Sequence, residues 1–524
     1  MSGHIVQAAK HQLHSAFAAL DDPAVPWKTL VLYLIVGVWA FETYLSLRQY
    51  KVYSFPSPPA SLLQHVDLET YKKSQRYGRD KARFGFVVAA WGLLNSLAIV
   101  YFDLMPFFWQ LSADVLQKLD WRTTEITQSI IFTLLSSLSR TILDLPLSYY
   151  SHFYLEEAHG FNKMTRTTFF TDFLKSTALG GIVLSPVIAA LISIIRWAGT
   201  DGFVLWVLVF MLAFQVVLQV LYPLVIQPLF NTLTPLPPGL LKARVEILAA
   251  SLRFPLAKLH QIDGSRRSAH SNAYFFGVLP WGNKHIVVYD SLIAKSTCSE
   301  IEAVLAHELG HWAHSDPTKL LVLAQAQIGF TFAVFAGFID NRSLFEAFGF
   351  GQASTLAEKA GLASPVLPVI IGLELFQLVL APLDAVLKFL MNSAVRSMEY
   401  AADSFAAGLD RPAFTDEQVK EMHKEPEPVA EKEESQSQEK GPEKKDEDQA
   451  TRKELREAEL AQSTQTSYAE LLQVALIKLH KQNLSSMHYD WLYSAYHHSH
   501  PTLPERLAAL EKHAGAVDRA KKAN

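Results

Sequence analysis

The sequence predicts an all-α, polytopic membrane protein with about seven transmembrane helices and a domain outside the membrane. Three observations predict this class. Of the 524 residues, 50% are hydrophobic and only 19% are charged, and the mean hydropathy is +0.12, which suits a membrane protein better than a soluble multidomain chain. Apolar runs long enough to cross a bilayer recur along the chain. One strongly charged stretch lies near its C-terminal end.

Seven apolar stretches carry the membrane prediction. A bilayer core about 30 Å thick needs roughly 20 apolar residues in a helix, because a backbone in lipid can satisfy its polar groups only within itself. One isolated run of about 14 residues would indicate a buried core helix, whereas seven long runs indicate membrane spans. The predicted spans are Pro26–Leu47, Phe84–Tyr101, Ile130–Tyr150, Phe173–Trp197, Phe203–Phe230, Leu320–Ile339 and Val366–Leu390.

Basic residues in the first loop predict the orientation. Short loops rich in Lys and Arg face the cytosol, and the second loop has only Lys118 and Arg122. With seven spans the N-terminus is then lumenal, and the segment 231–319 and everything after Leu390 face the cytosol. The basic residues of the first loop are Arg48, Lys51, Lys72, Lys73, Arg76, Arg79, Lys81 and Arg83.

Cysteine content and net charge exclude two kinds of site. The one cysteine, Cys298, allows neither a disulfide framework nor a zinc site built on several thiolates. Histidines and carboxylates must therefore hold any metal. The formal net charge of −4 offers no broad basic surface, so we expect no nucleic-acid partner.

A charged stretch near the C-terminus predicts a flexible insert at 411–465. It is rich in Lys, Glu, Pro, Gln and Ser, so it cannot bury enough apolar surface to fold. We expect helix there only near Thr451–Leu460, and its simplest interpretation is a solvated spacer. The predicted organisation is an N-terminal segment 1–25, transmembrane helices 1–5 in 26–230, a cytosolic segment 231–319, transmembrane helices 6–7 in 320–390, a further helix 391–410, the insert 411–465, and a C-terminal helical part with a tail at 466–524.

The cytosolic segment contains a metal-binding motif, His-Glu-x-x-His, in the predicted helix Ile301–Trp312. Residues four apart lie one above the other on a helix, so His307 and His311 can present both imidazoles to one zinc ion. Glu308 points beside them, where it can take a proton from an attacking water molecule. The pattern predicts a zinc-dependent hydrolase, and a chance pair of histidines on an apolar helix is the alternative.

A third protein ligand must complete such a zinc site. His314 is a poor candidate, because a straight helix places it about 10.5 Å along the axis from His307. A later helix offers Glu399 as the ligand and Asp403, one turn on, as the carboxylate that accepts the free N–H of a ligating imidazole. Arg396, three residues before Glu399, is expected either to hold that carboxylate or to form a surface pair.

The motif His307-Glu308-Leu309-Gly310-His311, followed by Arg396-x-x-Glu399-x-x-Ala402-Asp403, resembles the type I CaaX prenyl protease family. These are integral-membrane zinc metalloproteases of the a-factor-converting and prelamin-A-processing type. The resemblance runs in order through most of the C-terminal two thirds of the chain. Three further stretches carry it: Glu156-Glu157-Ala158-His159-Gly160-Phe161-Asn162, Ser271–Gly277 and Ser499–Leu507.

This resemblance implies a fold and an activity. The fold is seven long helices around a water-filled chamber, with one Zn²⁺ per chain near the cytosolic end. The activity is removal of the last three residues from farnesylated CaaX proteins, with a second cut nearer the substrate's N-terminus in some members. The resemblance makes Glu399 the third zinc ligand and Glu308 the general base.

Asn272, Ala273 and Tyr274 are predicted to bind substrate. They follow a polar run and alternate like an edge strand, which can pair with an extended peptide and align it over the zinc. An ordinary hairpin strand would show the same alternation.

His500 and Arg506 are predicted to act on the attacked carbonyl. Both lie in a segment bounded by prolines, and either can donate to the oxyanion that develops there. The residues alone do not distinguish His500 from His497 or His498, and the resemblance selects it.

The chain ends in Lys521-Lys522-Ala523-Asn524, which is similar to a dilysine retrieval signal, an address read by a receptor. We therefore expect a multi-pass protein of the endoplasmic reticulum membrane, with the inner nuclear membrane as a second location. The expected partners are the lipid bilayer and farnesylated CaaX proteins or peptides.

Two other functions remain open at this point. The first is a membrane quality-control metalloprotease that cuts misfolded or stalled chains. The second is a transporter or scaffold with structural histidines, whose conduction path polar groups within the spans would line. Those groups are Glu42, Asn95, Arg140, Asp144 and Glu374.

Overall fold

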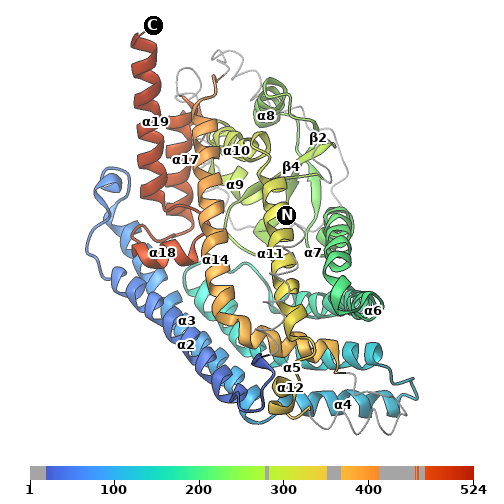
Figure 1. Ribbon diagram of the computed structural model, residues 1–524. Helices are drawn as coiled ribbons and strands as arrows, with labels where there is room; N and C mark the ends of the chain where they lie inside the picture. Colours follow the sequence, from blue (N-terminus) through green and yellow to red (C-terminus); the bar gives the residue numbers. More distant parts are fainter. Residues whose placement is uncertain are drawn as a thin grey trace.

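The computed structural model describes residues 19–277, 282–350, 367–411, 455, 457–459 and 467–523. They form two layers (Figure 1): a bundle of long helices below and a cap of shorter helices and a small sheet above. One helix, α14 (Val369–Ala407), runs through both layers.

The bundle contains seven helices that are long and apolar enough to cross a membrane, within the described part of the chain. This confirms the seven predicted spans, but several helices are longer than the spans. α3 begins before the apolar run because the side chain of Asp67 accepts from the backbone N–H of Thr70 and caps the helix there. The seven helices are Trp27–Val52 (α2), Leu68–Tyr101 (α3), Glu125–Glu156 (α5 and a π-helical turn), Arg166–Thr200 and Gly202–Phe230 (α6 with α7), Asp316–Phe338 (α11) and α14.

α14 is the central helix of the bundle. Buried residues make up 39% of its most apolar window, against 6% to 17% for the other six helices. Its 39 residues span about 58 Å at 1.5 Å per residue, nearly twice the thickness of a bilayer core. The predicted division between 320–390 and 391–410 therefore falls inside one continuous helix, and its C-terminal part belongs to the cap.

The cap surrounds one hydrophobic core, which includes Val245, Ile286, Leu305, Leu472 and Leu507. Its four-stranded sheet has the order β1-β2-β4-β3, in which only β2 and β4 are parallel. The elements of the cap are β1 (Leu233–Pro235), α8 (Leu240–Ser251), β2 (Leu256–Ile262), β3 (Ala273–Phe276), β4 (Lys284–Tyr289), α9 (Asp290–Lys295), α10 (Cys298–Ala313), α17 (Tyr468–Gln482), α18 (Trp491–His497) and α19 (Leu503–Ala523).

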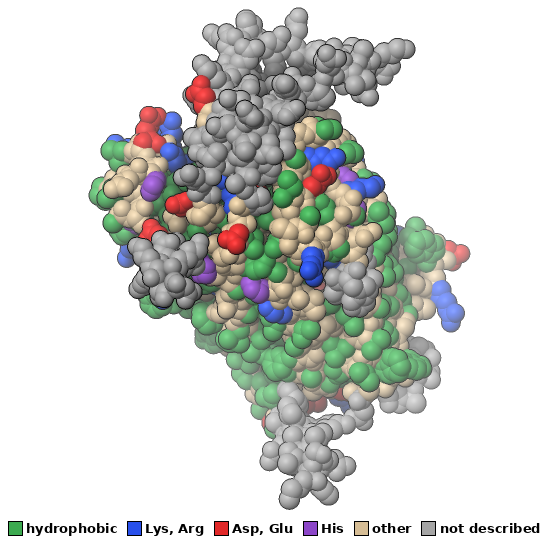
Figure 2. Space-filling view, turned by 90° about the horizontal axis from the view of Figure 1, so that it is seen from above, with side chains coloured by type: hydrophobic (Ala, Val, Ile, Leu, Met, Phe, Trp, Pro, Cys, Tyr) green, Lys and Arg blue, Asp and Glu red, His purple; other side chains and the backbone are tan. Residues whose placement is uncertain are grey.

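The surface differs between the layers. Seen from above, Lys, Arg, Asp, Glu and His side chains are interspersed with hydrophobic ones (Figure 2). In the bundle, large apolar side chains such as Leu174, Ile182, Leu205 and Leu224 are exposed, as expected for helices that face lipid. Two short helices, α4 (Leu104–Lys118) and α12 (Arg342–Ala347), lie at the end of the bundle far from the cap (Figure 1).

The charged insert differs from the expectation at its C-terminal end. Most of 411–465, including most of the helix expected near Thr451–Leu460, lies outside the described residues. Glu459, however, is 1% exposed. Its carboxylate accepts from the backbone N–H and the hydroxyl of Ser299 and pairs with Arg244 at 3.0 Å. This end of the insert is therefore part of the cap's core and not a solvated spacer.

Candidate active site

α10 places two histidines on one face. The helix begins in a capping box, in which Thr297 and Glu300 bond each other's backbone N–H groups. One turn separates His307 from His311, and their ring centroids lie 4.9 Å apart. His314, the rejected candidate, lies at the C-cap of α10 and packs against Phe405.

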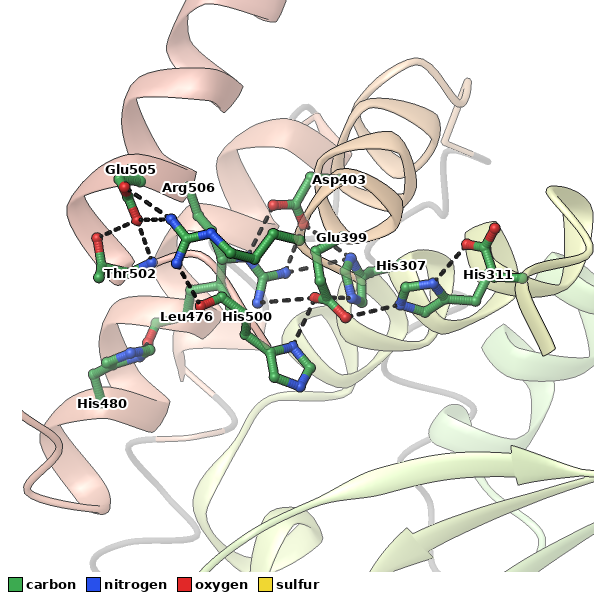
Figure 3. A network of polar contacts seen from close by, with 12 residues as sticks. His307, His311, Glu399, Asp403, Leu476, His480, His500, Thr502, Glu505 and Arg506 are labelled. Carbon is green, nitrogen blue, oxygen red and sulfur yellow. Dashed lines mark hydrogen bonds and ion pairs between the residues drawn. The ribbon is translucent and has the colours of Figure 1, made fainter. Parts of the chain in front are cut away.

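Glu399 of α14 faces both histidines (Figure 3). Its two oxygens lie 3.5 Å from Nε2 of His307 and 3.4 Å from Nε2 of His311. One ligand atom from each of the three residues lies within 4.8 Å of the others. Two imidazoles and one carboxylate are the donor set of a catalytic zinc site, so the residues present fit the metal.

A glycine of the motif permits this approach of α14 to α10. A Cβ added to Gly310 would lie 3.0 Å from Cα and 3.1 Å from the carbonyl oxygen of Ala402. Ala402 is itself buried between Glu399 and Asp403 on α14. The small residues therefore bring the backbones together and set the Glu399 carboxylate against the histidines.

The second nitrogen of each imidazole faces a carboxylate. Nδ1 of His307 lies 2.9 Å from Asp403, and Nδ1 of His311 lies 3.0 Å from Asp316. Because each carboxylate accepts the Nδ1–H, the Nε2 lone pairs point toward Glu399 and are available to a metal. Asp403 thus lies where the sequence places it.

Sequence reasoning missed Asp316. This residue is 2% exposed and opens α11 directly after α10. Ser315, with φ of 57°, turns the chain so that Asp316 points back to His311. Lys319 bonds its other oxygen at 2.9 Å. The signal was a carboxylate five residues after the second histidine at the start of a new helix.

Glu308 lies beside the histidines without a fixed partner. It makes no hydrogen bond or ion pair in the described part of the chain. Burial raises the pKa of its carboxyl group above the ordinary value, although the neighbouring His307 and His311 act in the opposite direction. A carboxylate with a raised pKa near a metal site can accept and return a proton.

Arg506 lies in the site, but its contacts differ from those of a free oxyanion donor. Its Nε and Nη2 donate to the two oxygens of Asp403 at 2.8 and 2.6 Å. Nη2 also lies 3.3 Å from Nδ1 of His307, and Nη1 lies 4.0 Å from Glu399. Most of its N–H donors therefore fix the position of Asp403. The carboxylate of Asp403 in turn lies against Nδ1 of His307.

His500 reaches the site from the loop between α18 and α19. Its Nδ1 lies 2.9 Å from Glu399, although 65% of its side chain is exposed. His497 and His498 pack instead against Tyr493 and Tyr489. Tertiary structure thus brings His500 alone of these three histidines into contact with Glu399.

Of the two roles expected for Arg396, the structure shows an ion pair, with the partly exposed Glu505, and not a contact that holds Glu399. Its Nη2 donates to both oxygens of Glu505 at 3.0 and 2.9 Å, while Nη1 donates to Ser494 and to the carbonyl of His500. Because the C-terminal helices cover this side of α14, the guanidinium turns to them rather than to its own helix.

Asn272, Ala273 and Tyr274 lie at the edge of the sheet, as the alternation predicts. β3 pairs with β4 and is the last strand in the order. The hydroxyl of Tyr274 accepts from Gln227 at 2.6 Å, which ties the strand to the first residue of α7 (Gln227–Phe230).

Comparison with known proteins places the chain in a family. Residues 49–232 match the family described as CAAX prenyl protease N-terminal, five membrane helices, and residues 235–514 match Peptidase family M48. The chain is 36% identical to CAAX prenyl protease 1 of Saccharomyces cerevisiae over 94% of its length and 97% of the yeast protein. It is 32% identical to the human CAAX prenyl protease 1 homolog over 90% of this chain and 93% of the human protein.

A solved structure agrees with this assignment. The crystal structure of S. mikatae Ste24p superimposes with a TM-score of 0.77 at 34% identity, covering 93% of this chain and 99% of that one. The two matched regions nearly adjoin in sequence, and together they include the bundle apart from most of α2 and the cap as far as residue 514. The chain therefore belongs to the M48 peptidases that carry the CAAX prenyl protease N-terminal region of five membrane helices.

Proposed function

We propose that this protein is a zinc endopeptidase that removes the C-terminal tripeptide from farnesylated CaaX proteins at the endoplasmic reticulum membrane. One observation carries the proposal. His307, His311 and Glu399 converge at the part of α14 that continues a membrane span into the cap. A peptide whose cysteine carries a lipid needs a hydrolytic site beside the membrane, and the names of the relatives agree with this substrate.

The proposed roles follow from the contacts. His307, His311 and Glu399 would hold one zinc ion, which supplies Lewis acidity to polarise a peptide carbonyl. Glu308 takes the proton of the attacking water, because it is next to the histidines and otherwise unpaired in the described structure. His500, exposed at the rim of the site, donates to the carbonyl oxygen as negative charge develops there.

Substrate alignment and orientation complete the proposal. The edge strand with Asn272, Ala273 and Tyr274 binds the extended peptide by backbone hydrogen bonds. The basic first loop supports a cytosolic position for the cap and for the site within it.

The test uses the full-length protein and two peptides that differ only in the farnesyl group. We expect about one zinc per chain, faster cleavage of the farnesylated peptide before its last three residues, and loss of cleavage with a chelator. Equal rates on both peptides would favour the quality-control function. Absence of stoichiometric zinc would contradict the enzyme proposal and favour a transporter or scaffold.

A further inference from the structure

α14 and α19 are joined by two ion pairs that bracket Glu399. Three residues before Glu399, Arg396 pairs with Glu505, and four residues after it, Asp403 pairs with Arg506. Glu505 and Arg506 are adjacent on α19, so one turn of this helix holds both sides of the ligand residue. The pair Asp403–Arg506 acts on His307. The pair Arg396–Glu505 lies beside the loop that carries His500, because Arg396 also bonds the carbonyl of His500.

Arg396 binds three parts of the C-terminal region at once. One of its nitrogens bonds the carboxylate of Glu505, and the other bonds the hydroxyl of Ser494 on α18 and the backbone carbonyl of His500 at 3.4 Å. A guanidinium has the donor geometry for such a bridge, whereas an ammonium group does not. The loop that carries His500 is thus fixed to α14 on the side that also carries Glu399.

Glu505 fixes the other end of the same loop. Its Oε2 accepts from the backbone N–H and the hydroxyl of Thr502, at 2.7 and 2.8 Å. A glutamate that bonds back to the N–H three residues earlier, at the start of a helix, is half of a capping box. Pro501 lies between the two fixed residues and further restricts the backbone of His500.

The imidazole of His500 needs this support. With 65% of its side chain exposed, it has little packing, and its contact in the site is to Glu399. The direction of the imidazole therefore depends on the backbone that carries it as well as on this contact. A shift of about 1 Å in a catalytic group can cost about 100-fold in rate.

We propose that Glu505 and Arg396 are positioning residues for the reaction, which hold the loop of His500 so that its imidazole faces the substrate carbonyl. The inference rests on the proposed function and deepens it. In this proposal neither residue contacts the substrate. Their effect passes through His500.

The experiment measures kcat, KM and zinc content of the full-length protein with the farnesylated peptide. Arg396→Lys keeps the charge but donates from a single nitrogen, so it cannot span acceptors that two guanidinium nitrogens reach, and Glu505→Gln loses the paired charge. Each is expected to lower kcat by about 10- to 100-fold, with KM within about twofold and zinc content unchanged. Arg196→Lys is the matched control, because Arg196 also holds a carboxylate (Glu125) and a carbonyl (Leu367), and it should retain wild-type kcat.

A double-mutant cycle separates positioning from a general structural role. In a His500→Ala background, Arg396→Lys should lower kcat by less than about twofold further, because the two changes remove the same contribution. Additive losses, unchanged kcat in the single variants, or loss of zinc would each overturn the inference. If the wild-type protein does not cleave the farnesylated peptide at all, the proposed function fails instead.

Discussion

The bundle and the cap bury different kinds of side chains. The core of the bundle is built from apolar groups such as Phe203, Phe335 and Phe376, and in six of its seven spans at most 17% of the most apolar window is buried. The cap buries charges. Arg244 is fully enclosed and contacts Glu302 and Glu459, two carboxylates that are at most 1% exposed. Two regions of one chain thus use different means to fix their helices.

The difference follows from what each region must hold. Packing in the bundle sets helix against helix through apolar contacts, which are non-directional. The cap must hold α10 so that His307 and His311 meet Glu399. The buried cluster lies against the N-terminal half of α10, where Tyr468 and Arg411 also contact Glu302. A buried charge is costly unless it is paired. The helices that carry these ion pairs can therefore adopt fewer relative positions than the helices of the bundle.

The largest expected effect tests whether changing one side chain of the cap stops cleavage without changing the stability of either region. Glu308→Gln should lower the cleavage rate by about 10²- to 10⁴-fold, because the amide cannot accept the proton. Zinc content and the thermal stability of both regions should stay at wild-type values, since the amide keeps the shape of the side chain. A variant that cleaves at nearly the wild-type rate would refute Glu308 as the base.

Removal of the buried arginine tests the comparison directly. Arg244→Ala should destabilise the cap by about 3–5 kcal/mol, because it leaves two carboxylates buried beside an empty position. The control is Lys28→Ala in the bundle, whose pair with Asp103 is partly exposed and should contribute at most about 1 kcal/mol. Denaturant unfolding measures the loss of unfolding free energy in both variants, and limited proteolysis shows whether the cap is the region that opens. Similar losses in the two variants would contradict the distinction between bundle and cap.

Asp316 tests how strongly the orientation of His311 depends on the carboxylate that bonds its Nδ1. Asp316→Ala should weaken zinc binding by about 10- to 100-fold, because Nδ1 of His311 loses the acceptor that fixes its tautomer and direction. Competition with a chelator measures the affinity without an activity assay. Glu69→Ala, which removes an exposed carboxylate paired with Lys73, is the control and should leave the affinity unchanged.

The smallest expected effect concerns the contact between α10 and α14. Gly310→Ala should cost about 1–3 kcal/mol, because the new methyl group meets the backbone of Ala402. Gly329→Ala in the bundle meets only the side chain of Leu208, at 3.3 Å, and that side chain can move. We therefore expect a smaller change in unfolding free energy for Gly329→Ala. The opposite order would show that the helix approach at Gly310 is not constrained.

Local patterns predicted much of the site. Helix periodicity alone places His307 above His311, and Asp403 one turn from Glu399, so these pairs needed no knowledge of the fold. The partners of Arg396 could not be found in the same way. Its i+3 neighbour Glu399 was the local candidate, but Glu505, more than 100 residues later, lies closer in space. Arg506, which was predicted to donate to the oxyanion, likewise bonds a carboxylate that is distant in sequence, Asp403.

Glu459 shows the limit of composition as evidence. Its surroundings in the sequence are charged and polar, which is typical of a solvated segment. Its burial depends on Arg244 and Ser299, which belong to distant helices. No window of sequence around Glu459 contains that information.

The sequence by itself determined the number of membrane spans and the spacing of the histidine motif. Bilayer thickness fixes the length of an apolar helix, and the helical repeat fixes which residues share a face. Tertiary structure alone decided that α14 continues from the membrane into the cap, that Asp316 supports His311, and that α19 brackets Glu399. Those outcomes depend on pairing between groups far apart in the chain, which burial and charge select only once the helices have packed.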